Sequence, residues 1–214
     1  MSRLIDVGLE QLTQMLVRMG DLAHKTASLS IMNYIEGKSN NRQVQDWSDM
    51  LIMMADEVEA KAFELIARYQ PVASDLRIIK SYIKISYDFT RYGRYAHDIS
   101  QICKMLGGMG ACEEWIKKLI KEMSEKTLGM VDTSVESLKN LNAEMAKTLS
   151  ETENKVDNLY ATYFERLVKK SPSASRCTIS SVLVVRYLER IADHATYTGE
   201  SIVYVATGEK VTLR

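Results

Sequence analysis

Apolar side chains recur along this chain at the three- and four-residue spacing of amphipathic helices. The clearest example lies near the C-terminus, where the intervals alternate between four and three residues over three heptads. That stripe consists of Val184, Leu188, Ile191, Ala195, Thr198, Ile202 and Val205. Positions with this alternation lie on one side of a helix. The pattern therefore predicts a long helix with a single buried face.

Clusters of glycine, proline and small polar residues separate the periodic segments. Only two prolines and ten glycines occur in 214 residues, so few helix breakers are present. The predicted breaks lie at 37–41, 70–73, 107–110, 140–142 and 171–175. The segments between them predict six helices, at about 3–36, 42–69, 75–106, 113–139, 143–170 and 177–206. Long helices joined by short connections form antiparallel bundles, so we expect an all-α fold.

The pattern also repeats within the chain. Subtracting 99 from the C-terminal stripe gives a second stripe with the same spacing: Ile85, Phe89, Tyr92, Ala96, Ile99, Cys103 and Leu106. The same offset matches Arg91 with Arg190, and each proline precedes the third helix of its half. We therefore predict two tandem three-helix bundles, 1–106 and 113–206, related by a pseudo-twofold repeat and followed by a short tail, 207–214.

Composition narrows the class of protein. Lys plus Arg and Asp plus Glu each number 28, and this zero net charge argues against a nucleic-acid-binding surface. No apolar run is long enough to span a bilayer, and the N-terminal residues lack the apolar block of a signal peptide. Cys103, Cys112 and Cys177 show no CxxC spacing, so we expect three buried, reduced thiols. These features together predict a cytoplasmic protein.

One helix carries two acidic residues with the spacing of a ligand pair. Glu189 and Asp193 are four residues apart, so their carboxylates share a face. Two like charges at this spacing mildly oppose each other unless a positive group lies between them, either a cation or an arginine from another helix. Oxygen ligands suit Mg, Ca, Mn or Fe. The other interpretation is a solvated flank whose acids pair with Arg186 and Arg190.

Motifs that would indicate catalysis are missing from the sequence. Asp21-x-x-His24 is a lone acid–histidine pair, and no Glu-x-x-His motif of the di-iron bundle enzymes occurs. No P-loop, GxGxxG or GxSxG pattern is found. We therefore expect that the protein is not an enzyme.

Two segments resemble motifs of a known family. QPVASDLR, at 70–77, is similar to the QPxAxDLR element of the PhoU family, and LERIADHA, at 188–195, is similar to its LERIGDHA element, with Ala192 in place of glycine. The resemblance implies a regulator of phosphate uptake that represses the phosphate-starvation response. It also implies contacts with the ATPase subunit of a phosphate ABC transporter, a sensor histidine kinase or both. A homodimer that reaches the membrane only through its partners is expected on the same basis.

Some members of this family bind metal clusters through an E(D)xxxD motif in each repeat. Carried over to this chain, the resemblance implies Glu189 and Asp193 as metal ligands, with Asp157 at a recurrent family position. The ion, divalent or trivalent, stays open among Fe, Mg, Mn, Ca and Zn. The first repeat has Thr90 and Arg94 at the matching positions, so we expect no metal there, because arginine does not act as a ligand.

Two alternative functions follow from the same residues. One is a metal-binding helical bundle with a storage or metal-dependent enzymatic role, and the other is an accessory protein of a different anion transporter. No glycine-rich anion loop or arginine cluster is seen, so we also predict that orthophosphate does not bind tightly to the isolated protein.

Overall fold

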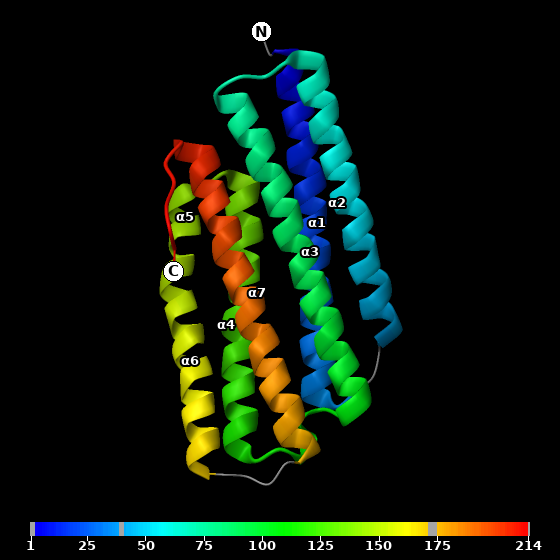
Figure 1. Ribbon diagram of the computed structural model, residues 1–214, viewed down its shortest axis with the longest axis vertical. Helices are drawn as coiled ribbons and strands as arrows, with labels where there is room; N and C mark the ends of the chain where they lie inside the picture. Colours follow the sequence, from blue (N-terminus) through cyan, green and yellow to red (C-terminus); the bar gives the residue numbers. More distant parts are fainter. Residues whose placement is uncertain (1–2, 39–40, 171–174, 214) are drawn as a thin grey trace.

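A computed structural model describes residues 3–38, 41–170 and 175–213, and the regular elements in these ranges are helices (Figure 1). The helices are α1 Leu4–Glu36, α2 Asn41–Tyr69, α3 Ser74–Leu106, the 3₁₀ turn η1 Met109–Ala111, α4 Glu114–Asn140, α5 Ala143–Lys147, α6 Leu149–Lys170 and α7 Arg176–Thr207. The predicted all-α class is therefore confirmed.

Local signals fix several helix ends. α1 stops at Gly37 and α7 stops at Gly208, which have φ of 70° and 80°. This left-handed conformation suits glycine because it has no Cβ. At the start of α7, the Ser175 hydroxyl accepts a hydrogen bond from the Thr178 amide at 3.1 Å, as an N-cap does.

The single helix predicted over 143–170 is wrong, because the structure divides it into α5 and α6 at Thr148. There the Thr148 amide bonds to the Met145 carbonyl at 3.2 Å, which tightens the last turn of α5. The same segment packs closely on Gly199 of α7. A Cβ built at Gly199 would lie 2.7 Å from Leu149 Cδ1 and 3.2 Å from the Ala146 carbonyl oxygen. A tertiary contact, which the apolar spacing does not encode, thus accompanies the break.

The helices form two bundles, α1–α3 and α4–α7, that meet along α3 and α7 (Figure 1). These two helices run antiparallel, side by side, through the middle of the molecule. α1 and α4 also contact each other across the two bundles. We call the line of contact between α3 and α7 the α3–α7 seam. It places residues about a hundred positions apart against one another.

Buried positions follow the predicted offset of 99 between the third helices. Every member of the α7 stripe is buried, and so is every member of the α3 stripe except the half-buried Leu106. Tyr92 and Ile191, which the offset matches, are both fully buried. The first helices match at 104 instead, as in Leu12 with Ile116. The interior pattern of the two halves is therefore repeated, with a shorter spacing before the last helix.

The prediction of three reduced thiols is wrong for two of them. Cys112 and Cys177 form a disulfide, and only Cys103 is free and buried among the described cysteines. The bond joins the segment before α4 to the first turn of α7. Its two cysteines are 65 residues apart, so no local spacing indicated it. Because disulfides are rare in the cytosol, the cysteines no longer support the cytoplasmic expectation.

Over the ranges that the structure describes, no helix combines the length and the apolar character needed to cross a lipid bilayer.

Candidate functional site

The predicted acidic pair lies at the edge of the core on α7. Glu189 has 12% of its side chain exposed and Asp193 has 3%. Arg186 pairs with Glu189 at 2.8 Å. Arg190 contacts both acids, with Nε 3.3 Å from Glu189 Oε2 and Nη1 3.1 Å from Asp193 Oδ2. The positive group between the two carboxylates is therefore an arginine of the same helix.

This arrangement does not fit a metal ion as it stands. A guanidinium stays charged and has no lone pair to donate, so Arg190 holds the position that a cation would need. Asp157, the third predicted ligand, is an exposed residue of α6. In the part of the chain that the structure describes, no three His, Cys, Asp or Glu side chains gather in a way that could hold a metal. The interpretation of a solvated flank is also wrong in one respect, since Asp193 is buried.

The matching positions of the first repeat hold no acid. The Thr90 hydroxyl donates to the Ser86 carbonyl at 2.9 Å, within its own helix. Arg94 is exposed. Arg91, one turn earlier, lies over the Tyr95 ring with its Cζ 4.6 Å from the centroid, and it donates a hydrogen bond to the Tyr95 hydroxyl. The first repeat thus presents cationic and aromatic groups where the second presents acids.

A hydrogen-bonded aspartate–histidine pair that the sequence did not reveal joins the two halves. Asp88 of α3 and His194 of α7 meet with Oδ1 and Nδ1 2.8 Å apart. Burial raises the pKa of Asp88, while its hydrogen bond to His194 opposes that rise. The rings of Tyr87, Tyr95 and Tyr197 lie with their centroids 5.3–6.2 Å from that of the imidazole. The Asp88–His194 pair therefore links α3 to α7 in the middle of the seam, and three tyrosine rings pack around it.

Tyrosine and arginine also face solvent along this part of the seam. Tyr87 is 57% exposed, Arg94 is exposed and Tyr187 is half-buried. Positions 87, 91, 94 and 95 recur at helical spacing, so they share one face of α3. We call this the tyrosine–arginine surface; it consists of Tyr87, Arg91, Arg94 and Tyr187, and the buried Tyr95 contacts Arg91 and Tyr187 beneath it. Tyrosine and arginine are the residue types most enriched where proteins bind one another.

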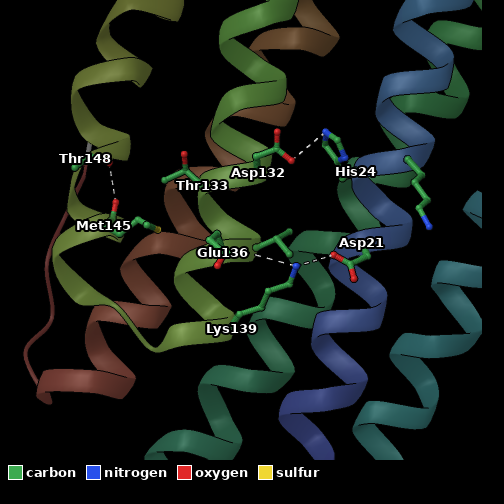
Figure 2. Close-up of a pocket in the computed structure, with 10 residues that line it drawn as sticks. Asp21, His24, Asp132, Thr133, Glu136, Lys139, Met145 and Thr148 are labelled. Atoms are coloured by element: carbon green, nitrogen blue, oxygen red, sulfur yellow. Dashed lines mark hydrogen bonds and ion pairs between the residues drawn. The ribbon is translucent and has the colours of Figure 1, made fainter.

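A wide cavity lies elsewhere, between α1, α4 and α5 (Figure 2). Its volume is about 770 Å³, and it takes residues from both halves. The residues that line it are Asp21, His24, Lys25, Asp132, Thr133, Val135, Glu136, Lys139, Met145 and Thr148. It is a wide groove with charges of both signs.

Ion pairs cross this groove from α1 to α4. His24 Nε2 lies 3.1 Å from Asp132 Oδ1, and Lys139 Nζ lies 3.2 Å from Asp21 Oδ1 (Figure 2). Asp21 and His24, which lie three residues apart on α1, therefore contact different residues of α4 rather than each other. The contact between His24 and Asp132 and the ion pair between Lys139 and Asp21 thus join the two halves across the groove.

Comparisons with known proteins agree with this architecture. The PhoU domain model matches residues 16–103 and 120–202. A phosphate-specific transport system accessory protein PhoU homolog of Clostridium acetobutylicum is 32% identical over 217 residues, which cover 99% of this chain and 98% of that protein. A homolog of the same description from Pseudomonas putida is 26% identical and is aligned over 98% of this chain and 83% of its own length.

Two crystal structures are similar over nearly the whole chain. PhoU from Pseudomonas aeruginosa superposes with a TM-score of 0.88 at 26% identity, covering 95% of this chain and 99% of that one. The phosphate transport system regulatory protein PhoU from Streptococcus pneumoniae gives a TM-score of 0.86 at 22% identity, with coverage of 96% and 98%.

Proposed function

Because this chain belongs to the PhoU family, we propose that it is an accessory protein of a phosphate transport system and acts through contacts with other proteins. The observation that carries this proposal is the match to the Clostridium acetobutylicum protein, which spans almost the full length of both chains. The PhoU domain model also matches each half of the chain, at 16–103 and 120–202, which supports the same conclusion.

The proposed partners are the ATPase subunit of a phosphate ABC transporter and a sensor histidine kinase. We place the contact at the tyrosine–arginine surface, because Tyr87 and Arg94 are exposed beside rings that are already ordered. Side chains held in place by their neighbours lose less conformational entropy on binding. The proposed consequence of binding is repression of the phosphate-starvation response.

The experiment measures binding of the full chain to each purified partner by biolayer interferometry. Tyr87→Ala/Arg94→Ala is expected to weaken binding by about tenfold or more, as loss of central interface residues does. Arg68→Ala/Tyr69→Ala is the matched control, because it removes the same two residue types from exposed positions on α2.

Two outcomes would contradict the proposal. If neither partner binds the parent, the accessory role through these partners fails. If the control weakens binding as much as the test variant does, the surface is misplaced. Binding to a component of another anion transporter, with none to the phosphate system, would favour the alternative client. Sedimentation of the free protein tests the expected homodimer.

The metal-binding alternative, with its storage or enzymatic role, stays a prediction and requires Arg190 to leave the acidic pair. Metal content measured after purification without chelators should fall in Glu189→Gln/Asp193→Asn relative to the parent, since carboxylates are the proposed ligands. Thr90→Ala in the first repeat should leave the metal content unchanged. The prediction fails if the parent, supplied with metal, holds none, or if the double variant holds as much.

A further inference from the structure

A second cavity lies at one end of the α3–α7 seam, where the C-terminal tail folds back on the two helices. Its volume is about 210 Å³. The residues that line it are Lys80, Ser81, Lys84, Glu200, Ser201, Tyr204, Lys210 and Val211. We call it the lysine cavity. Three of its residues are lysines, and they come from α3 and from the tail.

These lysines gather positive charge without matching acids. Lys80 and Lys84 are four residues apart on one helix face, where like charges repel. Among the carboxylates of residues 3–38, 41–170 and 175–213, none forms an ion pair with Lys80, Lys84 or Lys210. Lys117 of α4 and Lys155 of α6 instead lie 2.8 and 2.7 Å from a glutamate. The cavity therefore gathers three lysines whose ammonium groups make no close ion pair among the described residues, although Lys84 lies within electrostatic range of the buried Asp88.

The acid that lines the cavity, Glu200, holds the C-terminal tail in place. Glu200 Oε1 accepts a hydrogen bond from the Leu213 amide at 3.1 Å, which holds the tail against α7. Arg77 adds a further cation beside the cavity, with its Cζ 5.7 Å from the centroid of the Tyr204 ring. The Arg77 Nε is buried and has no hydrogen-bond partner among the described residues. Cationic groups thus outnumber acids at this end of the seam.

The tail lines one side of the cavity. The chain turns at Gly208, where φ is 80° and a Cβ would lie 2.8 Å from Arg77 Nη1. A larger residue is therefore disfavoured both by the backbone conformation and by the close contact with Arg77. Leu213 is buried at the far end of the tail. Between these two points, Lys210 Nζ lies 5.8 Å from the centroid of the Tyr204 ring. The third lysine is therefore positioned by packing at both ends of its segment.

We propose that the lysine cavity binds a small anion that carries two or more phosphoryl groups. Lysines act as point charges with three donors each, and they bind phosphate oxygens well. The cavity volume of about 210 Å³ leaves room for more than one tetrahedral oxyanion. Lysines on two separate segments would contact different phosphoryl groups. This inference goes beyond the proposed accessory role and does not depend on it.

The test uses the full chain and inorganic pyrophosphate as the probe, at constant ionic strength. Calorimetry should show saturable binding of pyrophosphate, with weaker binding of orthophosphate and of sulfate. Lys80→Gln/Lys84→Gln should weaken pyrophosphate binding by about tenfold or more, and Lys210→Gln by a similar factor, because each removes a charge-assisted contact. The Tm of the free protein should stay unchanged, since these side chains are exposed.

The matched control is Lys117→Gln/Lys121→Gln, which removes two lysines of the same spacing from α4. It should bind pyrophosphate as the parent does. The proposal is overturned if pyrophosphate does not bind, if the control loses affinity as much as the test variant, or if sulfate binds as tightly as pyrophosphate. Unchanged affinity in both cavity variants would also overturn it.

Discussion

At one end of the α3–α7 seam, Lys80 and Lys84 line a cavity; at the positions that the 99-residue offset assigns to them, Ile179 and Leu183 lie at the other end. Ile179 is 46% exposed and Leu183 is 37% exposed. The offset also matches Tyr204 with Met105, another exposed apolar residue. One end of the seam is therefore cationic and the other apolar, although their buried neighbours match.

In the middle of the seam, too, positions matched by the offset carry different kinds of side chain. The offset relates the pair Asp88 and His194 to the pair Tyr187 and Tyr95, whose rings stack with centroids 5.8 Å apart. Both pairs bridge the two halves, one by a hydrogen bond and one by aromatic contact. The repeat thus constrains which positions are buried, while the chemistry of the remaining positions differs between the halves.

The largest expected effect tests whether matched buried positions are equivalent. Phe89 and Leu188 are related by the offset and both are fully buried. Phe89→Ala should lower the free energy of unfolding by about 3–5 kcal/mol and Leu188→Ala by about 2–5 kcal/mol, because each leaves a cavity in the core. Denaturant unfolding measures both. A loss below about 1 kcal/mol in either variant would show that the two halves are not packed alike.

The disulfide is the next largest difference between the halves. The offsets of the first and third helices match Cys112 with Gly8 and Cys177 with Ile78, so the first half has no counterpart. Closing a loop of 65 residues contributes about 4 kcal/mol by the chain-entropy relation.

Cys112→Ser/Cys177→Ser should therefore lower the Tm by about 8–16 °C, as measured by calorimetry. The parent treated with reductant should behave like this variant, and the variant should not respond to reductant. An unchanged Tm in the variant would contradict the prediction.

A smaller effect should distinguish the ionisable pair from its aromatic counterpart. The pKa of Asp88 in the folded protein is raised above the unfolded value of about 3.9, so the folded state binds a proton that the unfolded state releases. As the pH falls through the raised pKa, the parent should gain free energy of unfolding relative to Asp88→Asn. As the pH rises through it, that gain is lost.

Denaturant unfolding of both proteins between pH 7 and about pH 4 measures the difference. A difference that is constant with pH, or that has the opposite sign, would show that burial does not control this carboxyl. Tyr187→Phe, at the matching position of the seam, should show no such dependence relative to the parent in this range.

The smallest expected effect concerns the exposed apolar end. Ile179→Lys/Leu183→Lys should change the free energy of unfolding by about 0.5 kcal/mol, since both positions are exposed and the new charges repel only weakly. The variant should not gain pyrophosphate binding, because the offset matches Lys210 with Ala111. A loss of several kcal/mol would instead show that this end is packed.

Local spacing was sufficient to predict most of the fold. The apolar stripes indicated the helices and their buried faces because a helix face is defined by residues a few positions apart. The break at Thr148 was missed because it lies beside Gly199 and Leu149, which meet only in the folded chain. The disulfide was missed for the same reason.

The site was less predictable than the fold. Spacing predicted a cation or an arginine from another helix between Glu189 and Asp193, whereas the group found there is Arg190 of the same helix. The choice depended on side-chain conformation, which periodicity does not determine. The lysine cavity was missed entirely, since Lys84 and Lys210 are far apart in the sequence.

The disulfide also determines how the molecule transmits mechanical force. A chain pulled from its two ends carries tension through the Cys112–Cys177 bond, so α4, α5 and α6 lie in a loop that bears none of it. In the oxidised protein this loop adds nothing to the stretched length. Reduction would release 65 residues and lengthen the chain by roughly 210–230 Å, at about 3.3–3.6 Å per residue. The fully stretched length of the protein therefore has two values, and the redox state of the Cys112–Cys177 bond determines which one applies.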